Sequence, residues 1–229
     1  TESMPQTAEN VAQKFNISRE EQDAFALRSQ QLTGKAIDDN RFADDIISVV
    51  VADRKGNETI IDKDEHPRPS TTADKLAKLS PLFEGGTISP GNASGINDGA
   101  SGVILMSAEL AKELNLTPLV KFVGSATAGT EPSLMGLGPI YSTQKVMKRY
   151  GLTAEDFDLV EINEAFASQS IECVRQLKLD SDKVNVNGGS IALGHPLGAS
   201  GTRILTTLIY EMKKRKCKLG LAAIGFALG

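Results

Sequence analysis

The sequence has no tryptophan, only two cysteines and few aromatic residues of any kind, at 5% of its 229 residues. Cys173 and Cys217 are too few for a disulfide framework or a cysteine-rich zinc site. No apolar run approaches the roughly 20 residues that a membrane-spanning helix needs. These shortages argue against a small disulfide-rich protein and a helical membrane protein. With no visible signal peptide, they predict a cytoplasmic location.

The chain also lacks an initiator methionine, because it opens at Thr1, which predicts a processed precursor or a fragment. It has no strong charge of either sign: 25 basic and 29 acidic residues leave a net charge of −4, which argues against a general nucleic-acid binder. A hydrophobic content of 40% and a charged content of 24% are typical of globular proteins. The length suits one large domain or two small ones.

The first part of the chain is polar, with few regular elements. Ser18 and Glu21 form a capping-box pattern, which predicts a helix at about 19–33. The β-branched stretch 45–51 predicts a strand. A long Pro- and Gly-rich excursion follows, with one short helix near 74–79. An excursion of this length in a compact protein is usually functional.

From Asp98 onward, strand and helix patterns alternate, which predicts a layered α/β architecture. The predicted strands are 101–107, which is apolar enough to be buried, 119–128, 157–163 and 219–229, with a strand end and loop at 183–189. The predicted helices are 108–114, 142–150, 163–178 and 200–216, and Gly151 is a suitable residue to end the second.

The glycine-rich loop 187–201 holds His195 between Gly194 and Pro196. Proline biases the preceding residue away from the helical region, and a flanking glycine lets the backbone approach a ligand closely. An imidazole presented in this way suits a general base. The alternative is a structural turn with an incidental histidine. A phosphate-binding P-loop does not fit, because no Gly-Lys-Ser/Thr follows.

Asn163 begins the motif NEAFA, where the third strand pattern passes into a helix pattern. Its structural role would be the N-cap of that helix. Its catalytic role would be an amide donor directed at a developing oxyanion. Position alone favours the cap.

Four distinct motifs follow one another along the chain: TAENVAQKFNISREEQDAFALRSQ, GNASGINDGAS, NEAFA and NVNGGSIALGHPLGASG. In this order and spacing they resemble the thiolase family over essentially all 229 residues. SMPQTAENVA, DEHPRPSTT and TAGTEPSLMGLGP look most like the branch that cleaves β-ketoadipyl-CoA in aromatic catabolism, although acetoacetyl-CoA thiolases share most of this text. The resemblance implies the thiolase fold and an acyltransferase that makes or breaks a carbon–carbon bond between acyl-CoA units.

The resemblance also implies a catalytic site. His195 would activate a nucleophilic cysteine of the N-terminal half, and Asn163 would order a water that holds the oxyanion of the thioester. A second cysteine near the C-terminus would move a proton at the substrate's α-carbon. Both named residues serve one reaction centre, so we expect them within ~10 Å of each other. Neither a metal nor a covalent cofactor is implied: CoA and acyl-CoA are substrates, and the assembly is a homo-oligomer, either a dimer or a tetramer.

For CoA, the resemblance points to six contact residues: Met4, Arg68, Phe83, Ser94, Ala165 and Phe166. Each has a structural alternative. Arg68 could be a solvated loop charge, Phe83 and Phe166 plain core, Ser94 a turn former and Met4 disordered.

The sequence departs from the family pattern near its end. Gly225 stands where the second cysteine belongs, and Ala227 replaces the neighbouring glycine. Cys217 comes earlier, within a basic run that could lower its pKa but more simply complements a helix dipole. Cys173 lies on an apolar helix face and is predicted to be core. Ser3 stands where acetoacetyl-CoA thiolases often carry histidine.

We therefore predict three regions. These are most of the thiolase loop domain at 1–96, a strand and helix that belong with the N-terminal half at 97–117, and the C-terminal α/β domain at 118–229. The N-terminal half with its nucleophile is expected to be missing, so the chain alone is predicted to be inactive. One alternative is a non-catalytic thiolase-like protein that binds CoA esters or partners. A remoter one, a ketoacyl synthase relative, is disfavoured by NEAFA and GHPLG.

Overall fold

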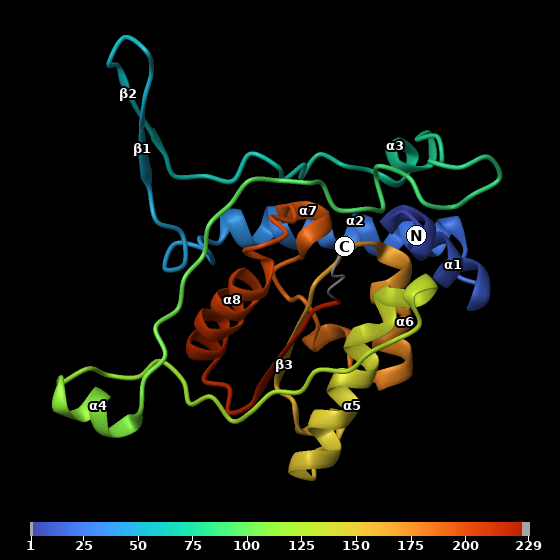
Figure 1. Cartoon of the computed structure of the whole chain (residues 1–229). Helices are drawn as coiled ribbons and strands as arrows, with labels where there is room; N and C mark the ends of the chain where they lie inside the picture. The colour runs from blue at the N-terminus through green and yellow to red at the C-terminus, as the bar shows by residue number, and fades with distance from the viewer. Residues whose placement is uncertain (1, 226–229) are drawn as a thin grey trace.

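The computed structural model describes residues 2–225, which form the helices and strands shown in Figure 1. The α-helices are α1 (Met4–Lys14), α2 (Arg19–Asp38), α3 (Ala73–Ala77), α4 (Ala108–Glu113), α5 (Gly138–Tyr150), α6 (Ala167–Leu177), α7 (Ser190–Leu193) and α8 (Ser200–Arg215). The strands are β1 (Val49–Ala52), β2 (Glu58–Ile61), β3 (Leu159–Ile162) and β4 (Gly220–Ala223). Short 3-10 helices are η1 (Pro132–Leu137), η2 (Ala154–Asp156) and η3 (Ser181–Lys183). Within residues 2–225, no helix is both long and apolar enough to cross a bilayer.

Two capped helices open the chain. The Ser18 hydroxyl accepts a hydrogen bond from the Glu21 N–H (3.2 Å), which confirms the predicted start of α2. This helix continues to Asp38 instead of ending near residue 33. The sequence did not indicate α1, because polar residues dominate it and its buried face is narrow. Ser3 caps α1, and Val11 is its most deeply buried residue.

A parallel strand pair forms the centre of the second part. β3 and β4 pair along their whole length, and Val184 bridges to Val160. All four residues of β3 are buried. α8 packs against both strands, α5 reaches β4, and α6 packs against α5. In Figure 1, α8 lies on one side of β3, and α5 and α6 lie on the other, which confirms the predicted layered architecture.

The apolar core joins these layers to α2. Phe157, Ile162 and Ile204 are among its largest fully buried side chains. α2 crosses the end of the layers in Figure 1 and contacts both α6 and α7. The polar first part of the chain is therefore fixed to the layered part through α2.

The strands predicted at 101–107 and 119–128 are absent, which corrects the expectation of a buried strand at the first of them. Neither segment forms a strand or pairs with one among residues 2–225, and Ile104 and Phe122 are 88% and 58% exposed. The apolar pattern indicates a propensity, but a strand also needs a neighbour to accept its backbone hydrogen bonds. Nothing in the described part of the chain supplies one.

The strand predicted at 45–51 appears, shifted, as β1 in an exposed hairpin with β2. The two strands are antiparallel, from Val49↔Ile61 to Ala52↔Glu58. All their residues are exposed, and the hairpin projects away from the layers in Figure 1. Asp53 closes the turn by accepting hydrogen bonds from two backbone N–H groups.

Most predicted helices are present with slightly shifted ends. Those predicted at 74–79, 108–114, 142–150 and 200–216 correspond to α3, α4, α5 and α8. Gly151 adopts the left-handed conformation after α5 (φ 64°), as predicted. The prediction that Asn163 begins a helix is wrong: α6 begins at Ala167, with Phe166 as its N-cap residue. Phe166 stays extended because it bridges Ala93. β4 covers part of the strand predicted at 219–229, whose last four residues, Ala227 included, lie outside the described part.

Replacing Phe157 with alanine should lower the free energy of unfolding by about 3–5 kcal/mol, because the ring is only 1% exposed and its loss leaves a cavity. Phe122→Ala is the matched control. At 58% exposure it should change stability by no more than about 0.5 kcal/mol. Urea unfolding followed by circular dichroism measures both. Equal losses would contradict the assignment of Phe157 to the core.

Candidate active site

The carboxyl ends of β3 and β4 bring Asn163 into a buried position. Its N–H donates to the Ala223 carbonyl (3.0 Å), so the strand pairing continues one residue past β3. Its Oδ1 accepts a hydrogen bond from the Ser190 hydroxyl (2.6 Å), and its Nδ2 lies 3.5 Å from His195 Nε2. Asn163 is 1% exposed, so protein contacts rather than water orient the amide. The expected closeness of Asn163 and His195 is confirmed.

The segment 92–97 joins the two motifs that supply these residues. At one end, the Ser94 N–H donates to the Ala165 carbonyl (3.0 Å). At the other, Asn97 Oδ1 accepts from the His195 N–H (3.1 Å). Gly194 has a φ of 95°, and a Cβ there would lie 2.5 Å from Asn97 Oδ1, so only glycine fits this close approach. The motifs GNASGINDGAS and NEAFA and the loop 187–201 therefore form one site.

The hydrogen bonds of His195 define which ring nitrogen is free. Nδ1 lies 2.6 Å from the Ser200 hydroxyl, which itself donates to the Pro196 carbonyl (2.9 Å). With the single hydroxyl proton assigned to Pro196, Nδ1 carries the imidazole proton and Nε2 keeps its lone pair. Burial and, second, the positive charge of Arg203 lower the pKa of His195. The imidazole is thus neutral near neutral pH, with Nε2 free to act as a base.

The carboxylate of Glu164 ties three segments together directly beside Asn163. It accepts hydrogen bonds from Ser29 Oγ (2.6 Å), Asn185 Nδ2 (2.8 Å) and the Ile191 N–H (3.3 Å). Burial raises the pKa of Glu164, and these hydrogen bonds oppose the rise.

Glu161, in β3, is a second buried glutamate. Its Oε2 has no hydrogen-bond partner within residues 2–225. Burial raises the pKa of Glu161 to about 8, against the attraction of Arg203. We therefore expect this side chain to be protonated near neutral pH.

A small cavity of about 20 Å³, enough for roughly one water molecule, lies at the residues that follow Asn163 and Glu164 in the NEAFA motif. Ala165, Phe166 and Gly225 line it, together with Thr7 and four others: Ala8, Met135, Gly136 and Gln169. Met4 lies one helical turn away, and its carbonyl accepts from the Thr7 hydroxyl (2.8 Å). Of the six predicted CoA contacts, Ala165 and Phe166 line this cavity, Ser94 hydrogen-bonds to Ala165, and Met4 hydrogen-bonds to Thr7 in its wall.

Arg68 and Phe83 are not part of this group. Arg68 is exposed, and its backbone N–H donates to Gln30 Oε1 (2.8 Å). Phe83 is half-buried in the excursion, where its carbonyl accepts from Gly86 N–H (3.0 Å). Neither residue lines the small cavity.

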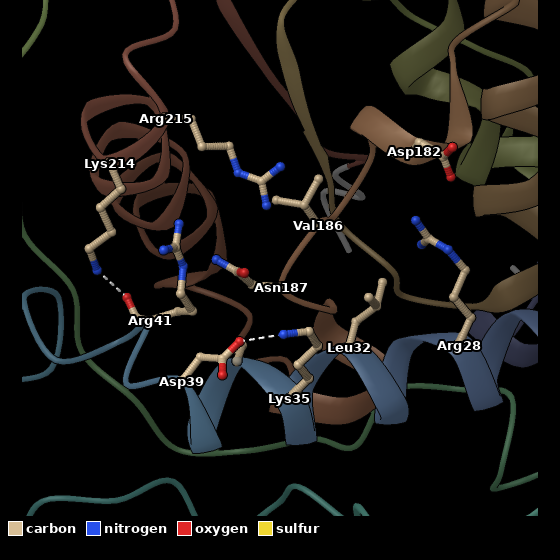
Figure 2. Close-up of a pocket in the computed structure, with 11 residues that line it drawn as sticks. Arg28, Leu32, Lys35, Asp39, Arg41, Asp182, Val186, Asn187, Lys214 and Arg215 are labelled. Carbon is tan, nitrogen blue, oxygen red and sulfur yellow. Dashed lines mark hydrogen bonds and ion pairs between the residues drawn. The ribbon is translucent and has the colours of Figure 1, made fainter.

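A much larger cavity, of about 640 Å³, lies elsewhere, between α2, the segment 182–187 and the C-terminal end of α8. Figure 2 shows its lining, in which cations outnumber acids: Arg28, Lys35, Arg41, Lys214 and Arg215 against Asp39 and Asp182. No predicted site residue lines it.

The sequence reasoning missed several residues that shape the site: Ser190, Ser200, Arg203, Glu161 and Glu164. Two of them carried a visible signal. Glu161 is a lone charge in the apolar strand LVEI, and Arg203 is a lone charge in the helix segment TRILTTLIY. Such charges are rarely buried without a specific role. The serines carried no comparable signal.

Comparison with known proteins agrees with these motifs. Family models of the thiolase N-terminal domain and the thiolase C-terminal domain match residues 1–109 and 116–229. The chain belongs to the thiolase family. It is 52% identical to an acetyl-CoA acetyltransferase of Thiocystis violacea, over 95% of this chain and 56% of that protein. It is 48% identical to a beta-ketoadipyl-CoA thiolase of Pseudomonas aeruginosa, over 99% of this chain and 57% of that protein.

The solved structures of thiolases show the same fold. The acetyl-CoA acetyltransferase of Bacillus anthracis matches with a TM-score of 0.95 at 46% identity, over 97% of this chain and 56% of that one. The thiolase N-terminal-domain match at 1–109 does not support the expectation that the N-terminal half is missing, because this region itself belongs to that domain. The chain spans about 56% of the length of the first relative. Its division at 96/97 and 117/118 stays a prediction.

The free energy of unfolding should fall as pH rises between the unfolded and folded pKa values of Glu161. Its pKa is raised from 4.5 to about 8 in the folded chain, so between these values the folded state holds a proton that the unfolded state has lost. The fall is at most about 1.4 kcal/mol per pH unit for one proton. Glu161→Gln should flatten it, whereas the exposed Glu58→Gln should not. Urea unfolding at several pH values between 5 and 8 measures the slopes, and an unchanged slope in Glu161→Gln would contradict the assignment.

Proposed function

We propose that the chain contributes the base and the oxyanion-binding part of a thiolase active site. The reaction is cleavage of a 3-oxoacyl-CoA by CoA, or the reverse condensation. The supporting observation is the pair formed by His195 Nε2 and Asn163 Nδ2, 3.5 Å apart beside a small cavity. The names of the relatives, acetyl-CoA acetyltransferase and beta-ketoadipyl-CoA thiolase, support the same chemistry.

The proposed cleavage proceeds through an acyl thioester. A thiolate attacks the 3-oxo carbon, and the C2–C3 bond breaks with its electrons passing to C2 and the adjacent thioester as an enolate. The proton taken from the attacking thiol passes to C2 and releases the shorter acyl-CoA. A CoA thiolate then displaces the acyl group from the first thiol, which regains the proton that CoA lost. His195 Nε2 would accept the proton of the attacking thiol, because the thiolate is the nucleophile. Asn163 Nδ2 would hold a water against the thioester oxygen.

Neither cysteine of the chain suits the role of nucleophile. Cys173 is buried, burial raises the pKa of its thiol, and its Sγ contacts the Gly136 carbonyl (3.7 Å). Cys217 follows the C-terminal end of α8, whereas Ser200, the contact of His195, begins this helix. At 1.5 Å per residue, the 16 residues of α8 place Cys217 about 24 Å from Ser200. We therefore propose that these 229 residues alone do not turn over substrate.

Gly225 would accept the cysteine of the family pattern. A Cβ at this position would lie 3.5 Å from the Met135 carbonyl oxygen, which is an ordinary contact. The residue also lines the small cavity with Ala165 and Phe166. A thiol at Gly225 would thus reach the place proposed for the substrate.

The proposed CoA ester lies along Met4, Ser94, Ala165 and Phe166, with Arg68 and Phe83 contacting its outer part. CoA and acyl-CoA are the substrates, without a metal or a covalent cofactor. The proposal includes assembly into a homo-oligomer in the cytoplasm. The exposed apolar residues at 103–105 support an assembled form, since large apolar patches usually mark contact surfaces.

The chain of 229 residues should not cleave acetoacetyl-CoA or β-ketoadipyl-CoA with free CoA above background, as followed by enolate absorbance. Turnover that disappears in Cys217→Ser would overturn this expectation. Turnover should appear when Gly225→Cys is combined with a polypeptide carrying the remainder of a homologous thiolase. In that complemented protein, His195→Gln should lower kcat/KM about 10²–10⁴-fold, the range for loss of a general base. An unaffected kcat/KM would refute the role of His195.

The second candidate function is non-catalytic binding of a CoA ester, and the cavity in Figure 2 favours it. Each of the three arginines that line this cavity is fixed by hydrogen bonds from part of its guanidinium group. Glu211 accepts hydrogen bonds from both Arg41 and Arg215, while the Ser181 and Val184 carbonyls accept from Arg28. Further N–H groups of these guanidinium groups make no hydrogen bond within residues 2–225, so they remain available to phosphate oxygens.

Calorimetry with CoA separates the two candidate sites. If the phosphates of CoA enter the basic cavity, Arg215→Gln should weaken binding about ten- to hundredfold, the effect of losing one charge-assisted hydrogen bond. Arg68→Ala should then have little effect. If CoA instead binds at the thiolase-like site, Arg68→Ala should weaken binding and Arg215→Gln should have little effect. Lys213→Gln, an exposed change beside the cavity, is the control for general charge. Binding that is insensitive to Arg215→Gln would remove the second candidate.

A further inference from the structure

Arg203 lies on the first turn of α8 with its guanidinium turned inward. Its Nη2 donates to the Ser190 hydroxyl (2.8 Å). Its Nε and Nη1 are buried and have no hydrogen-bond partner within residues 2–225. A buried guanidinium with unsatisfied donors is costly, so a structure that retains one gains something from its charge or its geometry.

A directional hydrogen-bond chain runs from Arg203 to the catalytic pair. Arginine has donors only, so the Ser190 hydroxyl must accept from Arg203 and use its single proton elsewhere. That proton goes to Asn163 Oδ1, at 2.6 Å. The amide oxygen is therefore turned toward Ser190, and the amide NH₂ is turned toward His195. Without the arginine, the hydroxyl could accept as well as donate, and the amide could flip.

The charges around the site make Arg203 the main cation that His195 faces. Glu161 and Glu164 face it from the end of β3, and Asp45 and Asp64 are further acids around it. His66 contacts Asn97 in the segment 92–97. Burial raises the pKa of Glu161 to about 8, so this carboxyl offsets the guanidinium charge less than an ordinary glutamate would. A positive charge at this position opposes a second proton on the imidazole.

We propose that Arg203 is a positioning residue of this site, which orients the Asn163 amide through Ser190 and so sets which amide group faces His195. The inference rests on the proposed function for the catalytic roles of Asn163 and His195. The coupling of Arg203 to these two side chains can be measured without turnover.

Proton NMR titration of the imidazole rings tests the coupling in the intact chain. The chain has two histidines, and His66→Gln identifies the resonances of His195. Arg203→Gln should move the pKa of His195 upward, toward its ordinary value of 6.5. Arg215→Gln removes a charge from the far end of the same helix and should leave this pKa unchanged. An unchanged titration in a folded Arg203→Gln protein would overturn the proposal.

The side-chain amide of Asn163 gives a second readout, which also decides the matter if Arg203→Gln does not fold. Ser190→Ala keeps the guanidinium but breaks the hydrogen-bond chain. It should shift the Asn163 NH₂ resonances and speed their exchange with water. Unchanged resonances and exchange in Ser190→Ala would refute the positioning role. A complemented protein whose activity ignores His195→Gln would instead refute the proposed function and leave the coupling intact.

Discussion

The buried carboxylate of Glu164 is the interaction on which the site depends. A carboxyl group buried inside a protein must be hydrogen-bonded, and Glu164 takes its donors from three segments: Ser29 of α2, Asn185 after β3 and Ile191 of α7. These bonds connect the polar first part of the chain to the layers of the second. They also bring the backbone so close at Gly189 that a Cβ there would lie 2.5 Å from Oε1 of Glu164. Asn163, next in sequence, is oriented by this junction.

Much of the fold could be predicted because its signals are local. Caps such as Ser18, the stop at Gly151 and the alternation after Asp98 depend on neighbouring residues alone. The failures have distant causes. Residues 101–107 have a strand pattern, but a strand forms only where another chain segment pairs with it. Asn163 has the composition of an N-cap, yet the bridge from Ala93 to Phe166 holds this segment extended until Ala167.

The proposed catalytic pair, Asn163 and His195, could be predicted from motifs, whereas the groups that orient it could not. His195 and Asn163 stand in long family-like strings, and the structure places their side chains 3.5 Å apart. Ser190 and Ser200 are ordinary residues of glycine-rich segments, and only the folded arrangement turns their hydroxyls toward the pair. The CoA contact of Arg68 stays a prediction. Its side chain is exposed, and the structure does not bring it to the cavity with Ala165.

The direction of α8 adds a field to the site that no single side chain supplies. The helix begins at Ser200, the hydrogen-bond partner of His195, so its aligned peptide dipoles present roughly half a positive charge there. Its basic last turn meets the negative end, which complements the dipole. The peptide dipoles of α8 thus favour a neutral imidazole at His195. Under the proposed function, such a site would stabilise a transient negative charge through the backbone of the helix.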